Sequence, residues 1–162
     1  MKPIVGIMGP GEGASAVVSG LAHELGRLAA LKGWVVLTGG RSAGVMHAAL
    51  EGAKVCGGLT VGVLPFGAGD DISPMVDICV RTGMGEARNV VNVLTSDVVL
   101  VCGMSSGTAS EVSFALKLKR PVILVAADSI TGQFFASLGG PLHLAQSAEE
   151  AIERAQTLLA GR

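Results

Sequence analysis

The chain has 162 residues, of which 49% are hydrophobic and 15% charged, with a formal net charge of −1 and a mean hydropathy of +0.58. A near-neutral chain without a block of like charges is poorly suited to broad capture of DNA or RNA, which depends on many Lys and Arg contacts to phosphates. No apolar run approaches the roughly 18 residues of a membrane span, and the apolar start Met1–Gly11 is too short for a secretory signal. Three widely separated cysteines (Cys56, Cys79 and Cys102) form neither a metal-binding spacing nor a disulfide framework. We therefore expect one cytoplasmic domain over residues 1–162.

Short apolar runs alternate with amphipathic stretches along the chain. Strands are predicted at Pro3–Met8, Trp34–Thr38, Leu59–Leu64, Asp77–Arg81, Val98–Cys102, Val122–Ala126 and Leu142–Ala145. Helices are predicted at Ala14–Lys32, Ala43–Val55, Glu86–Leu94 and Ala109–Lys119, with a last helix capped by Ser147. Continuous apolar strands separated by helices are typical of a parallel sheet covered on both faces. The expected fold is a doubly wound, Rossmann-like α/β domain.

Four glycine-rich segments fall where predicted strands end: Gly9–Gly13, Thr38–Gly44, Thr82–Gly85 and Gly103–Thr108. In open parallel sheets the ligand lies outside the carboxyl ends of the strands, where the strand order reverses. Glycine allows backbone N–H groups to approach a phosphate closely, and a helix N-terminus adds partial positive charge. One such loop is explained by a turn, but four at one edge predict a nucleotide-like or phosphate-bearing ligand. A further long irregular segment, Phe66–Met75, has the character of a lid or binding loop.

A nicotinamide-dependent dehydrogenase is not supported by these loops. Gly9, Gly11 and Gly13 do not have the G-x-G-x-x-G spacing of the dinucleotide fingerprint. The second predicted strand ends in Thr38-Gly39-Gly40, where the fingerprint places an acidic ribose-binding residue.

Three segments resemble the Lonely-Guy and DprA-like Rossmann superfamily: Gly39–Met46, Gly83–Asn89 and Gly103–Glu111. In the phosphoribohydrolases of that superfamily the third segment reads Pro-Gly-Gly-x-Gly-Thr-x-x-Glu. The chain matches this pattern at Gly107, Thr108 and Glu111, and has Gly103, Met104 and Ser105 in place of Pro-Gly-Gly. If the protein were an enzyme of this type, the resemblance implies that Arg88 and Glu111 would be its catalytic residues.

The chain resembles still more closely the molybdenum cofactor carrier proteins, a single-domain branch of the same superfamily. The likeness includes Pro3–Gly11, Trp34–His47, Gly103–Glu111, Lys119–Val122 and Phe134-Phe135. It implies a homo-oligomer, expected to be a tetramer, that stores or transfers the pterin cofactor, with molybdoenzymes as recipients. That cofactor carries a terminal phosphate and a dithiolene-bound oxo-molybdenum group.

The glycine segments and the resemblance together predict a cofactor-binding set and no residue that ligates a metal. Backbone N–H groups, Ser106 and Thr108 suit the phosphate and oxo oxygens, and Arg41 or Arg88 suits their charge. The predicted binding residues are Gly9, Gly11, Thr38, Gly39, Gly40, Arg41, Gly83, Arg88, Asn89, Gly103, Met104, Ser105, Ser106, Gly107, Thr108 and Glu111.

Several side chains have two interpretations. Glu111 acts as a general acid or base, or it caps the loop by accepting bonds from nearby N–H groups. Arg88 is an anion clamp, or a surface charge paired with a neighbouring acid such as Glu86. We interpret His47 as a polar helix-face residue, and Cys102 as a packing residue beneath the loop.

The sequence is compatible with three functions. The first is a cofactor carrier without turnover and therefore without catalytic residues. The second is a nucleoside 5′-monophosphate phosphoribohydrolase that uses Arg88 and Glu111. The third is a DprA-like DNA-handling module, which the neutral charge disfavours. We favour the carrier because the Pro-Gly-Gly half of the catalytic motif is absent.

Overall fold

A computed structural model describes residues 1–66 and 71–161 of the chain. The strands are β1 (Ile4–Met8), β2 (Val35–Thr38), β3 (Thr60–Leu64), β4 (Ile78–Arg81), β5 (Val98–Cys102), β6 (Val122–Val125) and β7 (Leu142–Ala145). The helices are α1 (Ala16–Leu31), α2 (Gly44–Val55), the 3-10 helix η1 (Gly85–Arg88), α3 (Asn89–Thr95), α4 (Ser106–Lys117), α5 (Ser129–Ser137) and α6 (Ala148–Ala160). No helix in this described part of the chain is long and apolar enough to cross a membrane.

The described strands form one seven-stranded sheet in the order β4-β3-β2-β1-β5-β6-β7, and every pairing is parallel. The central strand β1 pairs with β2 on one side and with β5 on the other, so that Val5 lies between Val36 and Val98. The predicted doubly wound, Rossmann-like α/β fold is confirmed.

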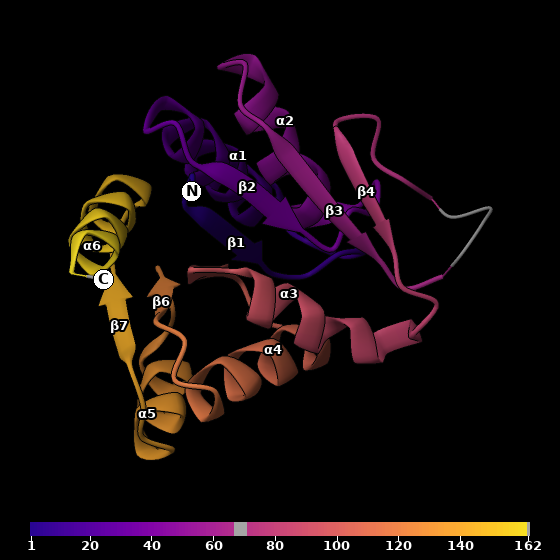
Figure 1. Ribbon diagram of the computed structural model, residues 1–162. Helices are drawn as coiled ribbons and strands as arrows, with labels where there is room; N and C mark the ends of the chain where they lie inside the picture. The colour runs from indigo at the N-terminus through magenta and orange to yellow at the C-terminus, as the bar shows by residue number, and fades with distance from the viewer. Residues whose placement is uncertain (67–70, 162) are drawn as a thin grey trace.

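Each face of the sheet has its own hydrophobic core, because consecutive strand residues point to opposite faces. One core joins α1, α2 and α6 to strand residues such as Ile7 and Leu100. The other joins α3, α4 and α5 to residues such as Leu37 and Val101. Figure 1 shows α1 and α2 on one side of the sheet and α3 and α4 on the other. Burial on both faces explains the continuous apolar strands in the sequence.

Apart from shifts of one or two residues at the ends of elements, the predicted elements differ from the structure in three places. α4 begins at Ser106, three residues before its predicted start, because the Ser105 side chain accepts a hydrogen bond from Thr108 N and caps the helix. α5 (Ser129–Ser137) was not predicted, although Asp128 caps it by accepting from Thr131 N. The predicted helix over 86–94 is divided into η1 and α3. The N-cap role of Ser147 is confirmed, because its side chain accepts from Glu150 N.

The irregular segment predicted at Phe66–Met75 falls partly on residues 67–70, which lie outside the described residues. Its second half is held against the loop that follows β2. Ile72 forms an antiparallel bridge with Arg41, and Ser73 N donates to Gly40 O at 2.9 Å. This half of the segment is therefore part of the wall beside the β2–α2 loop.

Helices α1 and α2 approach closely through glycine. A Cβ added at Gly26 would collide with the backbone of Ala49, whereas one added at exposed Gly20 in the same helix would meet nothing within 4 Å. Because interhelical separation depends on the side chains at the contact, Gly26 permits this crossing.

We expect Gly26→Ala to destabilise the protein by about 1–3 kcal/mol, because the added methyl overpacks a helix–helix contact. The matched control Gly20→Ala should instead stabilise it by about 0.5–1 kcal/mol, since glycine is a poor helix former. Urea unfolding measures both changes. Equal effects of the two substitutions would contradict the close helix contact.

Candidate functional site

The candidate site is a cleft at the carboxyl edge of the sheet. The chain leaves β1 toward β2 on one side and returns to β5 on the other, so the strand order reverses between β1 and β5. The loops after β1, β2 and β5 meet there with η1 and enclose a cavity of about 280 Å³. A crevice at such a switch point is where open α/β sheets bind ligands.

Most of the predicted binding residues line this cavity. They are Gly9, Gly11, Gly39, Arg41, Arg88, Asn89, Ser105, Gly107, Thr108 and Glu111. Residues of three of the four glycine segments are thus brought to one cleft, together with Arg88 and Asn89, whereas the segment Thr82–Gly85 contributes none.

Six predicted residues do not line the cavity: Thr38, Gly40, Gly83, Gly103, Met104 and Ser106. The Thr38 hydroxyl is buried and accepts from Gly40 N at 3.0 Å, so it shapes the turn after β2. Met104 packs against the core on the α4 side of the sheet. Ser106 and Gly83 are exposed. These residues support the loops or lie outside the cleft.

Further residues of the cavity were not predicted. They are Ile7, Met8, Glu12, Met46 and Glu86. The two β1 residues could have been inferred, because the last residues of the central strand necessarily border a switch-point crevice. The position of Met46 depends on how α2 packs beside the loop, and its spacing alone favours core packing.

Gly39 has a direct steric role in the cleft. A Cβ at this position would collide with the guanidinium of Arg88, and also with the sulfur of Met46. Glycine is therefore needed after β2 because the Arg88 side chain passes over the backbone at this point.

The first turn of α4 forms one wall. Ser105 Oγ accepts from Thr108 N at 3.2 Å and lies 2.9 Å from Thr108 Oγ1. The N–H groups of a first helical turn have no acceptor within the helix, and the helix dipole adds partial positive charge. Gly107 lies in this turn and lines the cavity without a side chain. The wall is suited to an anionic group.

Arg88 is buried, with 6% of its surface exposed, so the interpretation as a surface helix charge is wrong. Its Nη1 donates to Val63 O at 2.8 Å, while its Nε is buried without a partner among the described residues. Burial lowers the pKa of the guanidinium, and the negative charge of Glu111 opposes this change. An arginine stays protonated under such conditions, so the cleft contains a fixed positive charge.

Glu111 is also buried, with 7% of its surface exposed. Its Oε1 accepts from Asn92 Nδ2 of α3 at 2.8 Å, and no loop N–H donates to it among the described hydrogen bonds. The interpretation of Glu111 as the loop cap is therefore wrong, and Ser105 has that role. Burial raises the pKa of Glu111 to about 7, although the Asn92 bond and the charge of Arg88 favour the ionised form.

Arg41 lies at the outer rim of the cleft, where it pairs with Glu12 at 3.1 Å. On the adjacent helix, His47 Nδ1 lies 2.8 Å from Ser73 Oγ, in agreement with a polar helix-face role.

Cys102 belongs to the core on the α1 side, and burial raises the pKa of its thiol to about 12. Within the described ranges, no cluster of three or more His, Cys, Asp or Glu side chains is arranged to hold a metal ion.

Comparison of the sequence and of the fold with known proteins identifies the family of the chain. The SLOG cluster4 family model matches residues 2–152. The chain belongs to the SLOG cluster4 family. The resemblance to the Lonely-Guy and DprA-like Rossmann superfamily and to its molybdenum cofactor carrier branch is confirmed.

Three similar proteins cover most of this SLOG chain. The molybdenum cofactor binding protein of Rippkaea orientalis is 48% identical, with a TM-score of 0.96 over 98% of both chains. The molybdenum cofactor carrier protein of Chlamydomonas reinhardtii is 46% identical, with a TM-score of 0.93 over 99% of both chains. An uncharacterised protein of Archaeoglobus fulgidus is 40% identical over 127 residues, which are 74% of this chain and 82% of the relative.

We expect the buried carboxyl of Glu111 to make stability depend on pH. Its folded-state pKa of about 7 exceeds the ordinary value of 4.5. The carboxyl therefore does not destabilise the fold below pH 4.5, and it lowers the free energy of unfolding increasingly as the pH rises toward 7. Wild type should therefore become less stable than Glu111→Gln by up to about 3 kcal/mol at pH 8. Chemical denaturation of both proteins at pH 5 and pH 8 measures the difference. Parallel stability curves for the two proteins would show that Glu111 does not titrate with this shift.

Proposed function

We propose that the protein binds the molybdenum cofactor in the cleft at the β1–β5 switch point, shields it and releases it to a molybdoenzyme without chemical turnover. The structural observation that carries the proposal is the buried guanidinium of Arg88, which lines the cavity with one N–H left unpartnered. A buried donor without an acceptor in a native structure points to a missing partner. An anionic oxygen of the cofactor would supply that partner.

The residues of the cleft fit such a cargo. The first turn of α4, with Thr108 and Arg88, suits the terminal phosphate, because backbone N–H groups and a guanidinium both bind oxyanions well. The half-buried Met46 supplies an apolar contact suited to a flat pterin ring. The volume of about 280 Å³ is close to the lower end of the ~300–1,000 Å³ typical of ligand sites.

The phosphoribohydrolase is the second candidate, and one observation favours it. Arg88 and Glu111 line the same cavity, and the pKa of Glu111 near 7 suits a general acid or base. The carrier is the better supported function, because the binding and carrier proteins named above are 46–48% identical over nearly the whole chain.

Two outcomes are expected from protein purified after expression in a host that makes the cofactor. Elemental analysis should find molybdenum, and the oxidised extract should show pterin fluorescence; both should be absent from protein made in a host lacking cofactor synthesis. Mixed with adenosine monophosphate, the wild-type protein should release no adenine, because a carrier only has to bind and release its cargo. Steady adenine release that Glu111→Gln abolishes would establish the enzyme instead.

Binding of an anionic group by the first turn of α4 can be tested at Gly107. A Cβ there would meet nothing closer than 3.9 Å, so Gly107→Val should fold while its side chain enters the cavity. We expect cofactor content to fall at least tenfold with little change in the melting temperature of the ligand-free protein. The matched control is Ser106→Val, which adds the same side chain one residue earlier, outside the cavity. Equal cofactor content in the two variants would place the binding site elsewhere.

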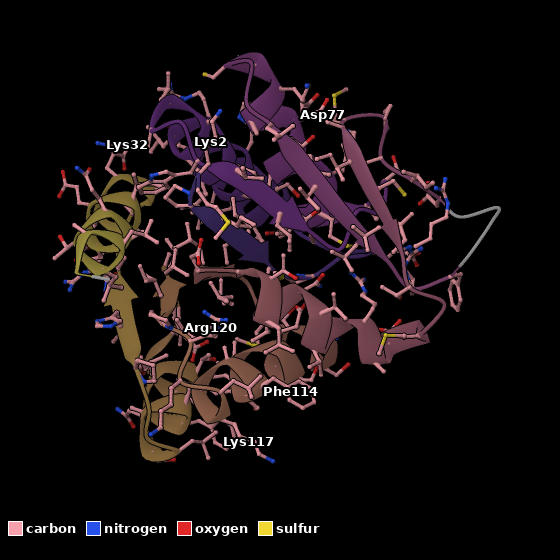
Figure 2. The ribbon with its side chains drawn as sticks, in the orientation of Figure 1. Lys2, Lys32, Asp77, Phe114, Lys117 and Arg120 are labelled. Carbon is pink, nitrogen blue, oxygen red and sulfur yellow. The ribbon has the colours of Figure 1, made fainter. Side chains whose placement is uncertain are left out.

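We also infer a homo-oligomer, with four subunits as the expected number, located in the cytoplasm. Leu94, Phe114 and Leu118 are between 37% and 49% exposed on α3, on α4 and at its end. Figure 2 shows Phe114 and Lys117 on the outer side of α4, away from the sheet. Contact between such helix faces would cover apolar surface that the single chain leaves in water. Native mass spectrometry of the same preparation reports the subunit number.

A further inference from the structure

The cavity combines an anion-binding wall with a buried carboxyl, and the two conflict if Glu111 is ionised. Glu111 and Thr108 are both at least nine-tenths buried and line the same space. A phosphate or an oxo-metal group placed against Thr108 would bring negative charge close to the Glu111 carboxylate. Like charges in a site of low dielectric constant disfavour the ionised form of a carboxyl strongly.

The other charged side chains of the cavity do not remove this conflict. The positive charges are Arg41 and Arg88, and the negative ones are Glu12, Glu86 and Glu111. With all five ionised, the cavity has one more negative than positive charge. Arg41 is already paired with Glu12, which leaves Arg88 for Glu86, Glu111 and the ligand together. A doubly charged anion would therefore enter a cavity that repels it.

Burial of Glu111 outweighs the contacts that favour its ionised form, which are the Asn92 amide and the charge of Arg88. Arg88 donates its Nη1 to Val63 O, and it forms no ion pair with Glu111 among the described salt bridges. The one hydrogen bond to the carboxyl comes from Asn92 Nδ2. The other end of the same amide, Asn92 Oδ1, is a buried acceptor without a donor among the described residues. A protonated Glu111 has an O–H to donate, which an ionised Glu111 lacks.

We propose that Glu111 takes up a proton when the anionic group of the cargo binds, so that loading of the cleft is coupled to proton uptake and release is favoured as pH rises. This inference rests on the proposed cofactor-binding function and adds to it a regulation of the same site. The proton comes from solvent, and it converts the Glu111 carboxylate to a neutral acid while no covalent bond of the cargo changes. Asn92 is the positioning residue that holds the carboxyl in place.

The pH dependence of ligand affinity follows from the coupling between ligand binding and protonation of Glu111. Without ligand, burial raises the pKa of Glu111 to about 7, and a neighbouring dianion raises it further. Below pH 7 the acid is already protonated, so affinity should be flat. Above pH 7 binding requires uptake of one proton, so Kd should rise toward tenfold per pH unit.

Inorganic sulfate is the probe for this test, because it stays a dianion from pH 6 to pH 9 and has no pterin. Calorimetric titrations at pH 8 in two buffers of different ionisation enthalpy give the number of protons taken up. We expect close to one proton for wild type, and a Kd that rises about tenfold from pH 7.5 to pH 8.5. Glu111→Gln, which cannot ionise, should bind sulfate without proton uptake and with a Kd independent of pH.

The matched control is Glu86→Gln, which removes an exposed carboxylate from the rim of the same cavity. This variant should bind sulfate more tightly but keep the proton uptake and the pH slope of wild type. Wild-type binding without proton uptake, unchanged uptake in Glu111→Gln, or failure of sulfate to bind would each overturn the proposal. If Glu111→Gln does not fold, the wild-type heats in the two buffers decide the question by themselves.

Failure of the proposed function would give a different result. In that case the purified protein would contain neither molybdenum nor pterin, while sulfate would still bind with proton uptake through Glu111. The site would then be a proton-coupled oxyanion site for another phosphate-bearing cargo.

Discussion

Parallel hydrogen bonding of β1 to both β2 and β5 is the constraint on which the site depends. Parallel strands place all their carboxyl ends at one edge, and the chain leaves β1 in one direction along the sheet and returns on its other side. The loops at this reversal diverge and leave a crevice between them. Glycine is concentrated in these loops because backbone and side chains approach closely there, as at Gly39 beneath Arg88.

The crevice holds charge that a folded protein normally keeps in water. Burial of an arginine and of a glutamate costs free energy unless both are fully hydrogen-bonded, and here neither network is complete. Arg88 Nε and Asn92 Oδ1 have no partner among the described residues. Strained or unsatisfied groups persist where the surrounding structure fixes them, and they concentrate at functional sites. The extensive cores on both faces of the sheet provide that support.

The sequence predicted the strands well because burial on both faces requires continuous apolar runs. It predicted α5 poorly, because Gly132 and adjacent Phe134-Phe135 do not give an apolar residue every three to four positions. The Asp128 cap was the one local signal for that helix, and Asp128 accepts from Thr131 N at 2.9 Å. The late start assigned to α4 has a similar cause, since Ser105 is both a loop residue and a cap.

The sequence by itself determined the fold class, the edge at which the loops gather and most residues of the cleft, because these follow from local apolar runs and from glycine at strand ends. Only the tertiary structure decided which charges are buried and what they contact. Arg88 reaches Val63 O across 25 residues of sequence, and Glu111 meets Asn92 across 19. Burial and hydrogen-bond partners of this kind depend on how β3 and α3 pack beside the site, and no local pattern contains that information.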